Sequence, residues 1–335
     1  MPWSVESCAR CAEEGDLLGR DDALRLLEAA EADPWPVWRA ADRVRRRFRG
    51  RAVHLCSIAA VTVGRCGEDC RWCAQSAHWA TGVEPRGLPP VDELVRAAQS
   101  ADAAGAGHFG LVSSGGRLPD DAFEGVLEAA RAIRQRTAVE VCGSFGTLTP
   151  DRARRLAEAG FHRYNHNLET SERHFPRVCT THTWQDRVDG ARTARAAGLE
   201  LCSGVLFGIG ETDADRVDAA LAVRGLEPTV VPINILHPIP GTPLADAAPL
   251  APMKILSLIA MVRLLLPRPI IKVAGGREHN LRDLQGLAFL AGADACLIGN
   301  YLTTAGRPAE DDLAMIRDLG LEVVRARARN GVRHG

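Results

Sequence analysis

Short runs of Val, Ile and Leu recur along this chain, and each is followed by an amphipathic segment rich in Ala and Leu. This alternation is typical of repeated strand–helix units, whose parallel strands are buried on both faces. The 335 residues are enough for one barrel of eight such units, so the pattern predicts a (β/α)8 barrel of the TIM type. We expect its strands near residues 52–60, 107–113, 138–145, 161–167, 199–207, 229–235, 269–274 and 294–298.

The sequence before the first predicted strand indicates helices. We therefore expect an N-terminal helical extension over residues 1–47 and a barrel domain over residues 48–335. Within the barrel, Thr149 is placed to cap a helix that begins at Pro150, and Gly160 is placed to end it in the left-handed conformation. Active sites of such barrels lie at the C-terminal ends of the strands, so we expect functional residues there.

Charge and hydropathy exclude several classes of function. The formal net charge of -1 shows no basic bias, so we expect neither a nucleic acid nor a membrane surface as a partner. No apolar stretch reaches about 18 residues, and the N-terminus lacks the regions of a signal peptide, which predicts a cytoplasmic protein. In a reducing compartment, the ten cysteines indicate metal or redox chemistry rather than disulfides.

Three cysteines, Cys66, Cys70 and Cys73, follow the first predicted strand closely. Their spacing lets each thiolate hold one iron of a 4Fe–4S cluster and leaves the fourth iron open. An open iron can bind S-adenosylmethionine through its amino and carboxylate groups, and reductive cleavage then yields a 5'-deoxyadenosyl radical. The alternative is structural zinc, which needs four ligands and usually two separated cysteine pairs, and no second pair follows at that spacing.

The cysteine motif, with Trp72 just before its third cysteine, resembles the signature of the radical S-adenosylmethionine superfamily. Further blocks of sequence stand at residues 67–76, 164–170, 202–204, 208–212, 231–234 and 275–278. Their order is similar to that of the biotin synthase family, and the likeness spans roughly residues 50–320. The resemblance implies radical-mediated insertion of sulfur into dethiobiotin, which forms biotin.

The family takes the inserted sulfur from a second, auxiliary iron–sulfur cluster deeper in the barrel. Cys142 and Cys202 match two of the family's ligand positions. The chain departs at two others, because Gly110 stands where a cysteine is common and Lys272 where an arginine is common. Glycine has no side chain to bind iron, and an ammonium group is not equivalent to a guanidinium.

A variant group within the family carries an extra cysteine at the end of the first strand, and Cys56 resembles it. The resemblance implies an auxiliary cluster, 2Fe–2S or larger, bound by Cys56, Cys142 and Cys202, with Cys179 in reserve. The alternative to a ligand role, for each of these thiols, is that of a buried structural cysteine.

The resemblance also implies residues that bind S-adenosylmethionine. Glu169 and its neighbour Asn167 would bind the ribose hydroxyls, and Arg187 would pair with the carboxylate. Two adjacent serines stand where a turn receives the methionine amino group. The full set is Trp72, Ser113, Ser114, Asn167, Glu169 and Arg187.

For the substrate, Asn165 and Asn234 would hold the ureido ring of dethiobiotin, since an amide offers both a donor and an acceptor. Asn165, Asn167 and Glu169 alternate along one segment, so we expect all three to face the barrel mouth. The resemblance implies a low-potential electron donor such as flavodoxin or ferredoxin, the iron–sulfur assembly machinery and a homodimer. Two alternatives stay open: a radical enzyme of the same barrel type without sulfur insertion, and a non-catalytic zinc or iron–sulfur carrier.

Overall fold

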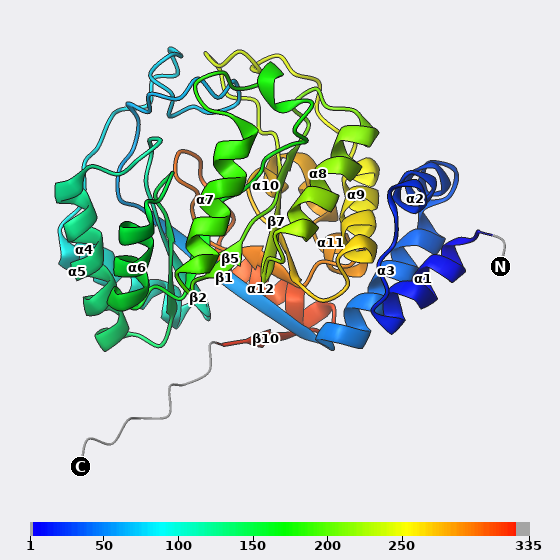
Figure 1. Cartoon of the computed structure of the whole chain (residues 1–335). Helices are drawn as coiled ribbons and strands as arrows, with labels where there is room; N and C mark the ends of the chain where they lie inside the picture. Colours follow the sequence, from blue (N-terminus) through cyan, green and yellow to red (C-terminus); the bar gives the residue numbers. More distant parts are fainter. Residues whose placement is uncertain (1–2, 326–335) are drawn as a thin grey trace.

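The structure, a computed structural model, describes residues 3–325 and is built on a closed parallel barrel surrounded by helices (Figure 1). β1 (Ala52–Ala60) pairs with β2 (His108–Val112) on one side and with β9 (Ala295–Leu297) on the other, which closes the sheet. The predicted (β/α)8 fold class is confirmed. The other strands of the barrel are β3 (Glu140–Ser144), β4 (Arg163–Asn165), β5 (Glu200–Cys202), β6 (Val205–Phe207), β7 (Val230–Ile235) and β8 (Ile270–Val273).

The predicted strand 199–207 is interrupted, and its two halves, β5 and β6, both pair with β7. The break falls at Gly204, where a side chain would collide with the carbonyl oxygen of Pro232. Pro232 has no N–H to donate to the ladder, so the pairing weakens at the same place. A further strand that was not predicted, β10 (Glu322–Val324), pairs in parallel with the start of β1.

Helices cover the outside of the barrel and alternate with the strands as predicted. The cap of α6 forms as expected, because the Thr149 side chain accepts a hydrogen bond from the Arg152 N–H and Gly160 ends the helix at a φ of 91°. The helices that follow the first strand are α4 (Val91–Ala103), α5 (Asp120–Arg136), α6 (Pro150–Ala159), α7 (Trp184–Ala196), α8 (Asp213–Gly225), α9 (Pro252–Leu265), α10 (Arg277–Leu281), α11 (Leu287–Leu290) and α12 (Ala309–Asp318), with short 3-10 turns at Phe175–Arg177 and Arg282–Leu284.

Three N-terminal helices, α1 (Val5–Glu14), α2 (Arg20–Ala32) and α3 (Pro34–Arg49), lie against one side of the barrel, where α3 packs on α9 (Figure 1). The buried indole Nε1 of Trp38 donates to the hydroxyl of Ser257 at 3.2 Å and ties these two helices together. Helix α9 is therefore buried on nearly every face. Within residues 3–325, no helix has the length and apolar character needed to span a membrane.

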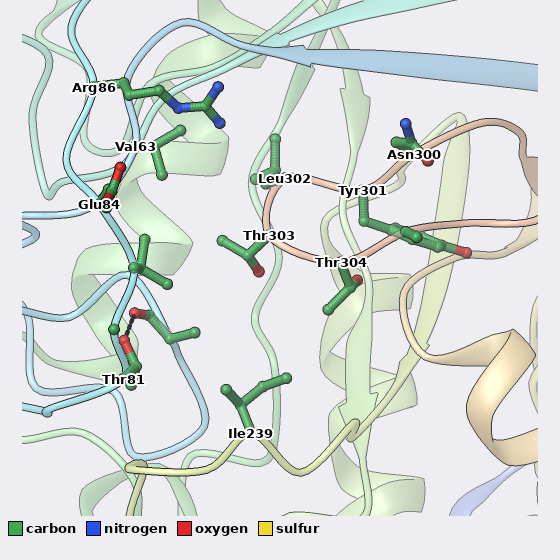
Figure 2. A pocket seen from close by; sticks show the side chains of 14 residues that line it. Val63, Thr81, Glu84, Arg86, Ile239, Asn300, Tyr301, Leu302, Thr303 and Thr304 are labelled. Carbon is green, nitrogen blue, oxygen red and sulfur yellow. Dashed lines mark hydrogen bonds between the residues drawn. The ribbon is translucent and has the colours of Figure 1, made fainter.

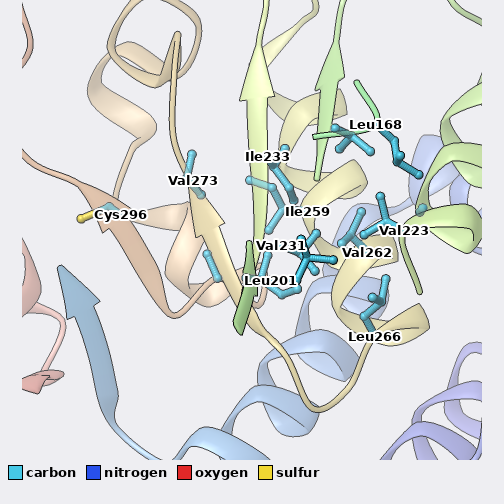
Figure 3. Close-up of a cluster of buried hydrophobic side chains, with 14 of the residues drawn as sticks. Leu168, Leu201, Val223, Val231, Ile233, Ile259, Val262, Leu266, Val273 and Cys296 are labelled. Atoms are coloured by element: carbon cyan, nitrogen blue, oxygen red, sulfur yellow. The ribbon is translucent and has the colours of Figure 1, made fainter. Parts of the chain in front are cut away.

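Alternate residues of each strand belong to two different environments. Leu201, Val231 and Cys296 join the large apolar cluster between the strands and the helices, together with α9 (Figure 3). Cys202, directly after Leu201, instead lines a cavity inside the barrel. The pleat of parallel strands thus sends one set of side chains to the helices and the next set into the barrel.

Candidate active site

The cysteine motif forms a well-ordered loop beyond the end of β1. Cys66 and Cys70 are buried, and Cys73 is half-buried. The Cys66 N–H donates to the Gln75 carbonyl at 3.0 Å, and the Cys73 N–H donates to the Cys70 carbonyl at 3.0 Å. All three residues line one cavity of about 240 Å³. Three thiols held on one loop beside a cavity are a donor set that suits a 4Fe–4S cluster.

Cys179 lies at this loop as well, with its sulfur 3.8 Å from that of Cys70 and 3.3 Å from His182 Nδ1. The hydrogen bond to Cys70 and the nearby His182 lower the pKa of the Cys179 thiol. This location argues against the reserve role of Cys179 at the deeper cysteine site. Its signal in the sequence was only its type, because no motif spacing joins it to Cys70.

The same cavity brings together side chains from several loops at the C-terminal ends of the strands. Arg187 on α7 donates through its Nε to His182 Nε2 at 3.1 Å and through a terminal nitrogen to the Asn167 carbonyl at 3.0 Å. The predicted cofactor-binding residues that line it are Trp72, Ser113, Ser114, Asn167, Glu169 and Arg187.

Glu169 is the buried acid of this cavity. Its carboxylate lies 3.6 Å from the guanidinium of Arg187, and the two side chains are 13% and 14% exposed. Burial raises the pKa of the Glu169 carboxyl, although the charge of Arg187 acts in the opposite direction. A buried carboxylate beside one guanidinium keeps spare acceptor capacity for hydroxyl groups of a ligand.

A second cavity, of about 370 Å³, continues deeper into the barrel and shares Trp72, Cys73 and Glu169 with the first. Both predicted substrate residues line it. The amide oxygen of Asn165 is buried without a hydrogen-bond partner among the described residues. Asn234 is instead held in place, since its oxygen accepts from the Gly275 N–H at 3.0 Å and its nitrogen donates to the Val205 carbonyl at 3.3 Å.

Three further thiols lie inside the barrel below this cavity. Cys56 on β1, Cys142 on β3 and Cys202 on β5 are 8%, 4% and 1% exposed. Burial raises the pKa of Cys142 to about 12, whereas the positive charges of Arg163 and Lys272 lower it. The fold therefore gathers three buried thiols beside two cations, whose charges oppose the effect of burial on the pKa of Cys142 and Cys202.

Two positions explain why this set differs from the commoner pattern. A side chain on Gly110 would have its Cβ 3.1 Å from the Ile58 side chain, so Ile58 would have to shift by a few tenths of an ångström to admit one. The ammonium of Lys272 lies 3.7 Å from the Cys202 sulfur. Burial by itself would lower the pKa of Lys272, but the neighbouring Cys202, Cys56 and Cys142 raise it.

The loop that follows β9 contributes residues that the sequence interpretation missed. Tyr301, Thr303 and Thr304 line the deep cavity and also a wider one of about 670 Å³ at the mouth. Figure 2 shows this loop facing Val63 and Arg86 across the opening. Two adjacent threonines after the last strand were the available signal, because ligand-binding loops occupy this end of a barrel.

Family models match most of the chain in two pieces. The model of the radical SAM superfamily matches residues 61–223, and the model of the biotin and thiamin synthesis associated domain matches residues 232–322. A biotin synthase from Heliobacterium modesticaldum is 47% identical over 309 residues, which cover 92% of this chain and 95% of that protein. A biotin synthase from Desulforudis audaxviator is 46% identical and covers 95% of this chain and 97% of that protein.

Solved structures with the same architecture are more distant in sequence. Methylornithine synthase superposes with a TM-score of 0.81 at 19% identity, covering 95% of this chain and 97% of that one. HydG, a maturase of the FeFe-hydrogenase, has a TM-score of 0.82 at 14% identity and covers 97% of this chain and 76% of that one. At these identities the likeness shows the fold alone.

Proposed function

This chain belongs to the biotin synthase family, and we propose that the residues lining its two connected cavities carry out that family's reaction. The reaction is the radical-mediated insertion of sulfur into dethiobiotin, which forms biotin. The observation that carries the residue assignment is the continuity of the cavities. One is lined by the cysteine loop, the other reaches Cys202, and Trp72, Cys73 and Glu169 border both.

Cys66, Cys70 and Cys73 would hold the radical cluster, since they offer three thiolates and no fourth ligand from the same motif. A 4Fe–4S cluster bound there supplies the electron that cleaves S-adenosylmethionine into methionine and a 5'-deoxyadenosyl radical. The loop itself contributes position and shelter, because its backbone hydrogen bonds hold the thiols at the edge of a half-enclosed cavity.

S-adenosylmethionine would lie in the first cavity. Glu169 and Asn167 accept and donate to the ribose hydroxyls, and Arg187 pairs with the methionine carboxylate. The carbonyls around Ser113 and Ser114 accept from the amino group. The partial burial of Glu169 and Arg187 supports these roles, because charge-assisted bonds are stronger where water is largely excluded.

Dethiobiotin would occupy the second cavity. The unpartnered oxygen of Asn165 can accept from a ureido N–H, whereas Asn234 would present to the ureido ring the edge of an amide that its own hydrogen bonds hold in orientation. The hydroxyls of Thr303 and Thr304 lie on the same cavity wall and suit the carboxylate at the other end of the substrate. The substrate would then lie between the cysteine loop and the deep thiols.

Cys56, Cys142 and Cys202 would bind the auxiliary cluster, with Lys272 beside Cys202. Three soft thiolates in a dry, positively charged pocket suit an iron–sulfur species, and their number does not determine whether it is 2Fe–2S or larger. We further propose a cytoplasmic homodimer that receives electrons from a flavodoxin or ferredoxin and its sulfur from the iron–sulfur assembly machinery. The N-terminal helices, with residues 1–47 as the proposed extension, would remain part of each protomer.

An anaerobic single-turnover assay tests this function. The reconstituted protein is mixed with S-adenosylmethionine, a low-potential reductant and dethiobiotin, and 5'-deoxyadenosine and biotin are measured together. We expect both products from the wild type, neither from Cys70→Ala, and 5'-deoxyadenosine without biotin from Cys202→Ala. Cys296→Ala is the matched control, because it removes a buried thiol that faces the helices. A wild-type protein that forms 5'-deoxyadenosine but never biotin would favour a radical enzyme without sulfur insertion.

A further inference from the structure

The N-terminal end of the barrel, opposite the active site, holds a compact group of histidine and glutamate side chains. His108 opens β2, Glu140 opens β3, and His162 directly precedes β4. The Nε2 atoms of both histidines lie 3.1 Å from the same oxygen, Oε2 of Glu140. Glu200, which opens β5, brings its Oε2 to 3.3 Å from His162 Nε2. Three possible ligand atoms, from His108, Glu140 and His162, thus lie close together, and Glu200 adjoins the group at His162.

Their spacing has the size of a metal coordination sphere. Bonds of about 2.1 Å to nitrogen and oxygen place adjacent ligand atoms roughly 3.0 Å apart in an octahedron and roughly 3.4 Å apart in a tetrahedron. The observed separation of 3.1 Å between Glu140 Oε2 and the Nε2 atom of each histidine lies within that interval. All three atoms of His108, Glu140 and His162 also lie within 4.8 Å of one another.

The charges around the group favour a cation. Glu140 and Glu200 bring two carboxylates, and the guanidinium of Arg163, 2.8 Å from Glu200, offsets one of them. His108 is 9% exposed in its side chain, whereas Glu140 and His162 are 27% and 31% exposed, so the site is walled on one side and reachable from solvent on the other. An ion could therefore enter from outside without opening the barrel.

We propose that His108, Glu140 and His162 form a binding site for a divalent first-row transition metal, with Glu200 hydrogen-bonded to His162 beside it. Two imidazoles and one carboxylate on one face, with further positions free, are a ligand set that suits ferrous iron as well as zinc. Neither the catalytic residues nor the three deep thiols belong to this group.

The position of the site indicates what the metal is for. Glu140 precedes Cys142 by two residues and Glu200 precedes Cys202 by two, which is about 6.6 Å along a strand. The site is thus the layer directly below the deep thiols, on the side open to solvent. Ferrous iron held here would be a supply for the auxiliary cluster, and this assignment of the metal, unlike the site itself, rests on the proposed function.

Calorimetric titration with Zn²⁺ tests the site in the full chain with its clusters reconstituted. We expect the wild type to bind one Zn²⁺ with an affinity that falls tenfold or more in His162→Gln and in Glu140→Gln, since even the loss of a partner that hydrogen-bonds to a ligand costs that much. Glu124→Gln is the matched control, because it removes an exposed carboxylate elsewhere and should bind as the wild type does. Equal Zn²⁺ affinity in all four proteins would overturn the proposal.

Two further measurements keep the outcome clear. In crystals of the wild type soaked with Zn²⁺, the anomalous peak should lie between His108, Glu140 and His162, and a peak only at the deep cysteines would overturn the site. Timed reconstitution with Fe²⁺ and sulfide should fill the auxiliary cluster more slowly in His162→Gln while the radical cluster fills at the wild-type rate. An unchanged rate together with lost Zn²⁺ binding would reject the supply role and keep the metal site.

Discussion

The sulfur of Cys179 lies 3.8 Å from the sulfur of Cys70, although the two residues are 109 positions apart in the chain. Cys179 follows the 3-10 turn at Phe175–Arg177, whose Phe175 packs against both cysteines. A fourth thiol therefore stands beside the loop of three. The two sulfurs would have to approach by only about 1.8 Å to reach the length of an S–S bond.

This proximity predicts a specific disulfide in the cluster-free chain. Oxidised glutathione should accept the two electrons of the thiol pair, so that Cys70 and Cys179 join and two molecules of glutathione are released. Peptide mass spectrometry without reduction should find the joined peptides, and iron uptake by the cysteine loop should fall. Cys179→Ala should resist the treatment and keep its iron uptake by the cysteine loop. A bond from Cys70 to Cys66 or Cys73 would contradict this reading.

Lys272 should support the auxiliary site through its charge. Its ammonium lies near Cys202 and opposes the rise in pKa that burial causes at Cys202 and Cys142. Lys272→Met should therefore weaken retention of the auxiliary cluster by about tenfold, as loss of an outer-shell partner does. Iron and sulfide analysis after gel filtration measures the loss. Lys272→Arg keeps the positive charge and should retain more cluster. Formation of 5'-deoxyadenosine should be unaffected by either change.

Glu169 should link ligand binding to pH. Burial raises its pKa, so the folded protein binds this proton more tightly than the unfolded chain does, and stability falls as the pH rises from the pKa of the unfolded chain through the raised pKa. Glu169→Gln should therefore raise the melting temperature of the ligand-free protein relative to the wild type at pH 8 and change it little at pH 5. The same variant should bind S-adenosylmethionine more weakly at pH 8. A lower melting temperature for the variant than for the wild type at pH 8 would contradict the expected cost of the Glu169 carboxylate to stability.

Asn165 should contribute to substrate affinity through its unpartnered oxygen. Removing it in Asn165→Ala should raise the Kd for dethiobiotin roughly tenfold, which corresponds to about 1.4 kcal/mol and to one hydrogen bond. Equilibrium dialysis of dethiobiotin with the reconstituted protein measures the change. His237→Ala, at another part of the cavity wall, is the control and should leave the Kd within a few-fold.

Arg263 on α9 should be important for stability rather than activity. It is fully buried, pairs with the buried Asp294 and donates to the carbonyls of Gly292 and Pro269. Arg263→Met leaves Asp294 without this partner and should lower the free energy of unfolding by about 3–5 kcal/mol. Urea denaturation measures it. Arg192→Met removes an exposed ion pair and should cost less than about 1 kcal/mol.

Local features of the chain were predictable because their causes lie within a few residues. The apolar runs placed the strands to within a few positions, and the cap of α6 at Thr149 followed from its own side chain. The split between β5 and β6 was not predictable, since it depends on how closely Gly204 approaches Pro232 on another strand. Helix α3 ends at Arg49, and the domain boundary at residue 47 stays a prediction.

By itself, the sequence determined the barrel, the cysteine loop and the set of polar residues at the strand ends, because strand pleat and motif spacing are local properties. Tertiary structure alone decided which distant residues meet. Strand register brought Cys56, Cys142 and Cys202 into one layer beside Lys272, and the chain path past α7 put Cys179 at Cys70. Register also joined His108, Glu140 and His162 at the opposite end. Contacts between separate strands depend on closure of the whole sheet, which no short segment encodes.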